Sequence, residues 1–175
     1  MLIRDSFNDI IKTIQRGKLL LLLPDSGRIV FGSLKSLLEN EHFENHFDQN
    51  QLTHLKIIFG NIAKLKNVYP HIHPRVETLL ALHKKQIFLK TDAIQLNLDL
   101  LNNDHIHTYL GVAITSLQKQ LINKLNSPIV IAHTSDSLQD HFDWIPHDLY
   151  SDIYQENSVN ISNDNNGNLI FLDDH

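Results

Sequence analysis

Cysteine is absent from this chain of 175 residues, which excludes disulfide bonds, thiolate metal sites and a cysteine nucleophile. Long apolar runs are also absent. The densest run, Leu19 to Leu23, is much shorter than the roughly 20 residues that a membrane-spanning helix needs. No charged and then apolar leader is recognisable at the start of the sequence. We therefore expect a cytoplasmic protein without a membrane span, in which Leu19 to Leu23 forms a buried strand.

Positive charge is missing from the last part of the sequence, where Asn126 to His175 contains neither lysine nor arginine. The net charge of −5 argues against a general nucleic-acid binder, because affinity for phosphate backbones comes largely from basic residues. Between His54 and Lys90, in contrast, seven basic residues accompany one acid, Glu77. This stretch forms either solvated helix faces or a phosphate-binding patch. The candidate phosphate or RNA contacts in it are Lys56, Arg75, Lys84 and Lys85.

The glycine-rich motifs that most often hold nucleotide phosphates are missing, since neither G-x-x-x-x-G-K-[ST] nor G-x-G-x-x-G occurs. The G-x-S-x-G elbow of serine hydrolases is missing as well. Histidines at metal-ligand spacing occur as His42 with His46, His71 with His73 and His105 with His107. The first pair lacks the adjacent glutamate of metalloproteases, and the other two fall in expected loops. We therefore expect no metal site.

Segments with helical periodicity alternate with short apolar runs, a pattern that predicts helices covering a largely buried sheet. The helices are expected at residues 7–14, 61–66, 76–82, 115–125 and 149–154, with a helix-compatible stretch at 33–51. The strands are expected at residues 19–23, 28–31, 55–59, 86–90, 109–114, 129–131 and 168–172. Thr115 and Gln118 form a capping box that opens the helix at 115–125. We expect one α/β domain over residues 1–175, with a polar loop at 157–168.

Several short motifs, in this order, resemble the YrdC family across nearly the whole chain. The stretch from Gly17 to Ser26 resembles the family's glycine, apolar strand and Leu-Pro-Thr-Asp-Thr, and Phe31-Gly32 resembles its Tyr-Gly. Tyr109 to Thr115 falls where the family has Gly-Val-Arg-Ile-Pro, and Ser127 to Val130 resembles the Pro-Ile-Val before its Ser-x-Asn motif. The resemblance implies an α/β fold in which helices pack on an open, twisted, mixed sheet with a concave face.

The resemblance also implies an activity, because YrdC proteins make threonylcarbamoyl-AMP from threonine, bicarbonate and ATP for tRNA modification, and several were first described as double-stranded RNA binders. This sequence departs from the family at the residues that carry the activity. No lysine or arginine occurs in residues 42–51, where the family has Lys-x-Arg. The family's arginine is replaced by Ala113, its Ser-x-Asn by His133-x-Ser135, and its Thr-Asp-Thr by Asp25-Ser26-Gly27. Adenylation needs several cations or a metal ion around the phosphates, so these losses together indicate that the reaction is gone.

Three hypotheses follow from these observations. The first is a catalytically degenerate YrdC-like protein that binds a nucleotide, double-stranded RNA or tRNA in its cleft. The second is an active threonylcarbamoyl-AMP synthase that uses ATP and magnesium, with a clamp rebuilt from Arg28 and Lys35. The third is a protein-interaction domain that docks through the acidic region at residues 126–175. The candidate pocket residues are Pro24, Ser26, Arg28, Lys35, His133 and Ser135.

Overall fold

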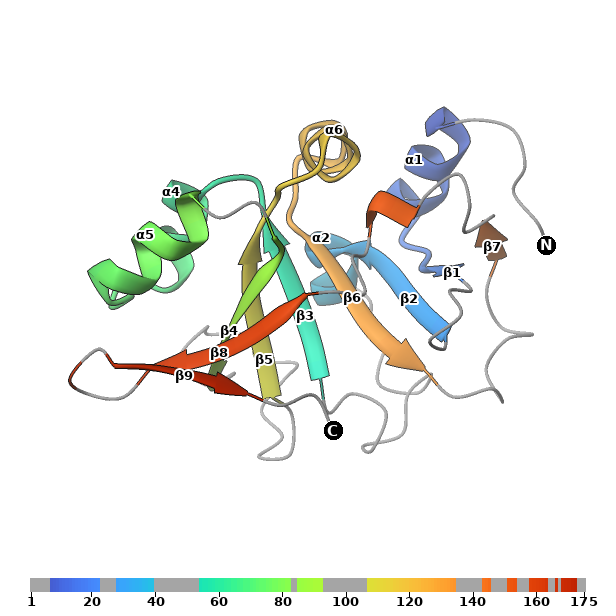
Figure 1. Ribbon diagram of the computed structural model, residues 1–175. Coiled ribbons are helices and arrows are strands. Elements are labelled where there is room, and N and C mark those ends of the chain that lie inside the picture. The colour runs from blue at the N-terminus through green and yellow to red at the C-terminus, as the bar shows by residue number, and fades with distance from the viewer. Residues whose placement is uncertain are drawn as a thin grey trace.

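Nine strands among the described residues form a single sheet, in the order β7-β1-β2-β6-β3-β5-β4-β8-β9 (Figure 1). The computed structural model describes residues 7–22, 28–39, 54–82, 85–92, 107–134, 143–145, 151–153, 158–163, 166 and 168–172. The strands are β1 (Leu20–Leu22), β2 (Arg28–Ser33), β3 (His54–Phe59), β4 (Ile87–Asp92), β5 (His107–Val112), β6 (Ile129–Thr134), β7 (Asp143–Ile145), β8 (Val159–Asn163) and β9 (Leu169–Leu172). The helices are α1 (Phe7–Gln15), α2 (Leu34–Glu39), α4 (Ile62–Val68), α5 (Pro74–Leu82) and α6 (Ser116–Leu125), with a 3-10 turn, η4, at Ser151–Ile153.

The sheet is mixed and open. β3 pairs with β5 in parallel and with β6 in antiparallel orientation, and β4 pairs in parallel with β8 and antiparallel with β5. β7 lies at one end of the strand order and β9 at the other, so the described strands do not close into a barrel. The α/β class and the open, mixed sheet expected from the sequence are therefore confirmed.

Apolar side chains of the central strands alternate between the two faces of the sheet, as expected for a sheet that is buried on both sides. On one face, here called the α6 face, Ile58, Ile129 and Ile131 pack with the buried residues of α1 and α6. On the other, here called the α5 face, Leu55, Ile57 and Phe59 pack with the buried residues of α4 and α5. Within the described part of the chain, no helix is long and apolar enough to span a bilayer.

Two sequence-based expectations about this sheet are wrong. The strand predicted at residues 28–31 stops before Gly32, but β2 continues to Ser33, and Gly32 pairs with Val130 inside it. A Cβ atom there would collide with Leu19, so a glycine allows the close approach. The polar stretch at 157–168 was expected to be a loop, yet it contains β8, which pairs with β4 on one side and β9 on the other. Its polar residues do not prevent pairing, because backbone hydrogen bonds hold the strand.

Two further expectations are corrected in their extent. Of the helix expected at 149–154, the described residues form the three-residue 3-10 turn η4, and the others lie outside the described residues. The stretch at 33–51 forms a helix at Leu34–Glu39, and its remainder lies outside the described residues. The other expected helices and strands are present with shifts of a few residues at their ends, which is the usual uncertainty of helix and strand boundaries.

Asn126 ends α6 in the left-handed conformation, with φ 50 and ψ 42, and is the only non-glycine residue of positive φ among those described. Asparagine tolerates this conformation better than alanine does. We expect Asn126→Ala to lower the free energy of unfolding by about 1 kcal/mol, and Asn126→Gly to leave it unchanged or slightly higher. Urea denaturation measures both variants. Asn123→Ala, at an exposed position in the same helix, is the control, and an equal loss in Asn123→Ala and Asn126→Ala would contradict the explanation.

Candidate functional site

Two lysines flank a tyrosine in one cross-strand row on the α6 face. Lys56 of β3 lies opposite Tyr109 of β5, and Tyr109 lies opposite Lys90 of β4. Directly opposed residues share a face of the sheet, so the three side chains lie side by side. Lys56 is 4% exposed and Tyr109 5% exposed, whereas Lys90 is half-buried. The row therefore brings a buried ammonium group, a phenol and a second, more accessible ammonium group onto one surface.

Phe88 of β4 forms the apolar floor beside this row. The Lys56 Nζ lies 4.9 Å from the centroid of the Phe88 ring, a distance at which a cation is attracted to an aromatic face. Gly111 of β5 makes room for the ring, because a Cβ atom on that residue would lie 2.9 Å from two of its carbon atoms. The absence of a side chain at Gly111 thus leaves the space that the Phe88 ring occupies beneath Lys56.

β8 adds polar side chains to the same face. Asn160, which is buried, lies opposite Phe88 on the neighbouring strand, and Ser162 follows two residues later, on the same side of β8. Ser158, just before the strand, has a buried hydroxyl oxygen for which the described residues provide no hydrogen-bond partner. Under α1 and α6 the face is lined by isoleucine and leucine, so its polar side chains are concentrated on β3, β5, β4 and β8.

Gln86 and Gln118 form a buried polar network at the upper end of this face, where β5 leads into α6. Gln118 Oε1 accepts from the backbone N–H groups of Ile114 at 2.9 Å and Thr115 at 3.2 Å. Its Nε2 donates to Gln86 Oε1 at 3.0 Å and to the carbonyl oxygen of Ile153 at 3.1 Å. Gln86 Nε2 in turn donates to the Val112 carbonyl at 2.9 Å. Two glutamine side chains thus connect β5, α6 and η4.

The candidate pocket residues predicted from the sequence are not all brought together. Arg28 and His133 lie on neighbouring strands at one end of the β2–β6 ladder, where Ile29 pairs with His133. Lys35 is exposed at the opposite end, where its backbone N–H donates to Ser127 Oγ at 3.1 Å. β2 spans roughly 17 Å from Arg28 to Ser33, since each strand residue advances about 3.4 Å, and Lys35 lies beyond Ser33 in α2. Pro24, Ser26 and Ser135 lie outside the described residues.

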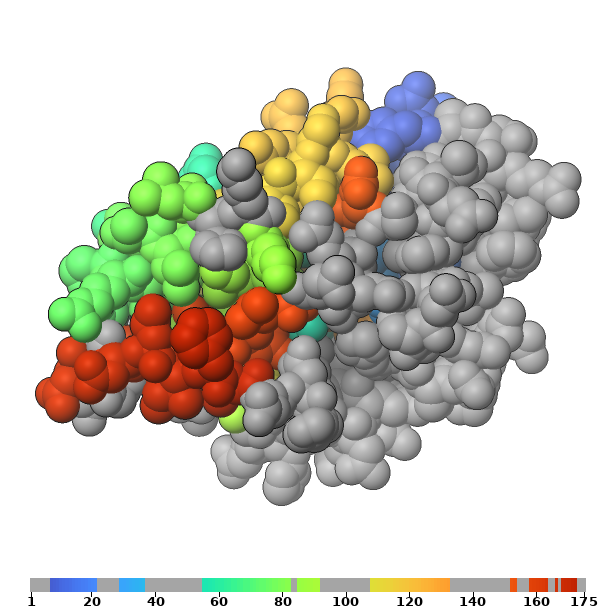
Figure 2. Space-filling view, viewed as in Figure 1, coloured from blue at the N-terminus to red at the C-terminus, as the bar shows by residue number. Residues whose placement is uncertain are grey.

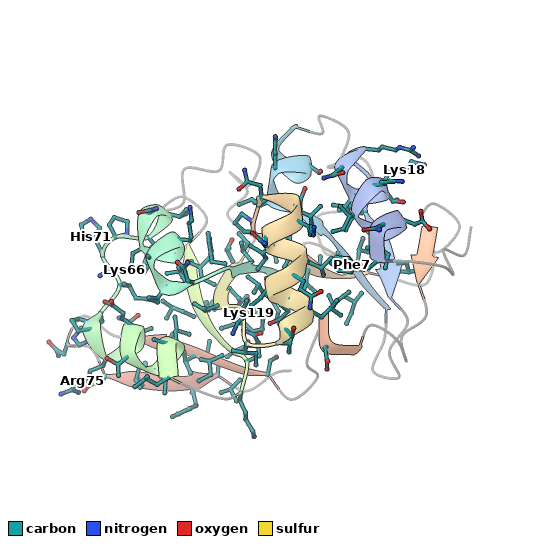
Figure 3. The ribbon with its side chains drawn as sticks, turned by 90° about the horizontal axis from the view of Figure 1, so that it is seen from above. Phe7, Lys18, Lys66, His71, Arg75 and Lys119 are labelled. Atoms are coloured by element: carbon teal, nitrogen blue, oxygen red, sulfur yellow. The ribbon has the colours of Figure 1, made fainter. Side chains whose placement is uncertain are left out.

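The predicted phosphate contacts are divided between the two faces of the sheet. Lys56 is buried on the α6 face, whereas Arg75 is exposed at the start of α5, which packs on the opposite face. Figure 3 shows Arg75 at the α4–α5 end of the molecule, far from Lys119 on α6. Lys85 is exposed just before β4, and Lys84 lies outside the described residues. Lys56 and Arg75 therefore cannot belong to one flat patch.

In the described part of the chain, no three histidine or acidic side chains lie close enough together to hold a metal ion. His71 is exposed and His73 accepts a hydrogen bond from the Arg75 backbone N–H through Nδ1 at 3.2 Å. His42, His46 and His105 lie outside the described residues. The sequence analysis did not assign Tyr109 or Lys90 to a site, although each of Lys56 and Lys90 directly adjoins an apolar residue of its strand, which was a usable signal.

Comparison with solved structures relates this fold to known proteins, whereas no protein-family model and no curated protein matches the chain by sequence. The chain is similar to E. coli YciO at a TM-score of 0.59 and 13% identity, covering 98% of this chain and 93% of YciO. It is similar to P. abyssi Sua5, solved with L-threonine, at a TM-score of 0.54 and 13% identity, covering 93% of this chain and 53% of Sua5. Full-length HypF, solved in a phosphate- and nucleotide-bound form, gives a TM-score of 0.57 at 13% identity, covering 94% of this chain and 28% of HypF.

These similarities define the class of fold. YciO, Sua5 and the matching part of HypF share the YrdC-like fold, and this chain has the same fold along nearly its whole length. The resemblance seen in the sequence motifs is thereby confirmed at the level of structure. The chain spans about half the length of Sua5 and little more than a quarter of the length of HypF. The activities of those larger proteins therefore do not transfer to this chain on the basis of the shared fold.

Proposed function

We propose that this protein binds a nucleotide on the α6 face of its sheet, with Lys56 and Lys90 as phosphate contacts, and that it does not make threonylcarbamoyl-AMP. The observation that carries the proposal is the burial of Lys56, which is 4% exposed on a face that is apolar beneath α1 and α6. Removing an ammonium group from water is costly. Lys56 shares a cross-strand row with a second lysine, Lys90, and two neighbouring ammonium groups favour a ligand that carries more than one negative charge.

The surroundings of Lys56 favour a phosphorylated ligand over a single carboxylate. Lys90, the Tyr109 hydroxyl and the Asn160 amide provide further donor groups on the same face. A ligand that engages several of these donors must carry several acceptor oxygens and more than one negative charge, as a polyphosphate does. The nucleotide-bound state of HypF, which shares the fold, supports the same class of ligand.

Duplex RNA is a less well supported ligand than a nucleotide. A phosphate backbone is recognised by several cations spread along one accessible surface. Lys56 is buried and Arg75 lies on the opposite side of the sheet, so two of the predicted RNA contacts cannot reach one duplex together. The arrangement suits a small ligand held against a sheet.

The second half of the proposal concerns catalysis. Ala113 occupies the position that corresponds, by the sequence resemblance, to the arginine of the YrdC motif. It is buried in the apolar cluster of the α6 face, and its backbone N–H donates to the Phe59 carbonyl at 2.8 Å. A methyl group cannot stabilise the charge that develops on phosphate oxygens during adenylation, and Lys35, a proposed substitute, lies at the far end of β2 from Arg28. Both observations support binding without synthesis.

Isothermal titration with ATP, AMP and inorganic phosphate tests the binding. We expect ATP to bind with a Kd below about 1 mM, which corresponds to about −4 kcal/mol, and more tightly than AMP or phosphate, because it presents more charged oxygens. Pyrophosphate release is then measured with ATP, magnesium, threonine and bicarbonate. We expect no threonine-dependent release. Absence of ATP binding would overturn the first half of the proposal, and threonine-dependent pyrophosphate would overturn the second.

A further inference from the structure

β9 forms one edge of the described sheet, and its exposed side chains are large and apolar. Phe171 is 69% exposed and Ile170 is 47% exposed, and they are consecutive residues of the strand. Edge strands of soluble proteins are usually protected from pairing by charged residues, proline or bulges. β9 has the sequence Leu-Ile-Phe-Leu and contains none of these. The β8–β9 hairpin is seen in red at the outer end of the molecule in Figure 2.

The two exposed residues point to opposite faces of the sheet. Phe171 lies opposite Ile161, which is buried in the cluster of the α5 face, and Ile170 lies opposite Ser162, on the α6 face. A helix docked on either face would cover only one of them. A strand added alongside β9 places its own side chains on both faces and so covers both at once, while its backbone pairs with the edge.

We propose that β9 pairs with β9 of a second copy of this chain, in antiparallel orientation, to join two sheets into one. The pairing is self-complementary: centred on Phe171, it sets Phe171 against Phe171 and Ile170 against Leu172 across a two-fold axis. No charged side chain lies within β9, so the paired strands meet without like-charge repulsion.

Charge complementarity also favours a second copy as the partner. Asp173 and Asp174 follow β9 directly in the sequence. In an antiparallel pair centred on Phe171, Leu172, the last described residue of β9, lies opposite Ile170 of the other copy, close to the start of that copy's β9. Arg75, which is exposed near the start of α5, lies at that same end of the molecule (Figure 3). The pairing therefore directs the acidic sequence that follows each β9 toward the end of the other copy that carries Arg75.

Sedimentation equilibrium of the full chain over about 1 to 200 µM tests this proposal. We expect a concentration-dependent monomer–dimer equilibrium, since a four-residue edge is small compared with the roughly 1,200 Å² or more that a stable interface buries. Phe171→Lys and Ile170→Lys should each weaken the dimer at least tenfold, because a lysine on either face disfavours strand pairing. Both variants alter exposed side chains and should remain folded, which circular dichroism checks.

Leu82→Lys is the matched control. Leu82 is 77% exposed at the end of α5, so the variant removes an equally exposed apolar side chain from a helix and leaves the strand edge intact. We expect it to leave the dimer unchanged. A chain that is monomeric at every concentration would overturn the proposal. An equal effect of Leu82→Lys and Phe171→Lys would overturn it as well, because it would indicate non-specific apolar association.

Discussion

Replacing Lys56 with methionine is expected to weaken ATP binding roughly ten- to a hundredfold. Methionine is similar in length to the apolar stem of lysine and carries no charge. The variant therefore removes the ammonium group and keeps most of the packing against Phe88. A hydrogen bond to a charged group contributes about 1.5–3 kcal/mol, which corresponds to this range of affinity. Isothermal titration of the variant against ATP measures the effect. Lys90→Met should give a smaller loss, because Lys90 is half-buried and its contact with a ligand is more strongly hydrated.

Two variants control this experiment. Lys119→Met removes a cation from an exposed position on α6 and should leave ATP affinity unchanged, which separates the effect of the site from that of net charge. Lys56→Arg retains the charge and should bind ATP more tightly than Lys56→Met. Thermal unfolding of every variant shows whether the fold is intact before affinities are compared. If Lys56→Met bound ATP as tightly as the unaltered chain does, Lys56 would be a structural residue and the proposed site would be wrong.

Replacing Gln118 with alanine is expected to lower the free energy of unfolding by about 3–5 kcal/mol. Gln118 is 0% exposed, and its side chain serves two backbone N–H groups, the Gln86 amide and the Ile153 carbonyl. Alanine leaves several of these buried groups unpaired, at about 1–3 kcal/mol each, although relaxation and water entry reduce the sum. For a chain of this length the loss corresponds to a fall in Tm of roughly 10 °C. Urea denaturation and thermal unfolding measure the change.

Gln120→Ala is the matched control for Gln118→Ala. Gln120 lies in the same helix but is exposed, and its Nε2 donates only to Ser116 Oγ, at 3.0 Å. We expect a change within about 0.5 kcal/mol, as is usual for surface substitutions. A double-mutant cycle with Gln86→Ala should show a non-additive loss, since the two amides are bonded directly. Equal losses for Gln118→Ala and Gln120→Ala would show that the buried network contributes nothing beyond helix propensity.

Much of the secondary structure could be predicted from the sequence because its signals are local. The helix predicted at residues 7–14 follows from the helical spacing of apolar residues that include Ile10, Ile11 and Ile14, and all three are buried in α1. The capping box of Thr115 and Gln118 is present at the start of α6 as predicted. Such signals depend on residues within one or two turns of the same helix, so no knowledge of the rest of the molecule is needed.

β8 could not be predicted, because its evidence is not local. Asn160 and Ser162 make the segment polar, and only pairing with β4 shows that it is a strand. The two strands are about 70 residues apart in the sequence, and no short-range pattern encodes such a pairing. The position of Gly32 inside β2 could not be predicted for the same reason. A glycine inside a strand allows another part of the chain to approach closely, and only the tertiary structure shows that this part is Leu19.

The candidate site, like the fold, could be predicted from the sequence only in part. The sequence alone identified Lys56 as a candidate phosphate contact and showed that the cations of the YrdC motif are missing at positions such as Ala113. Only the tertiary structure decided which groups accompany Lys56, because the strand register sets Tyr109 and Lys90 beside it and places Arg75 on the other face. The sequence specifies the chemical identity of every side chain. The neighbours of a side chain in a sheet depend on long-range strand pairing, and local residue patterns do not encode that pairing.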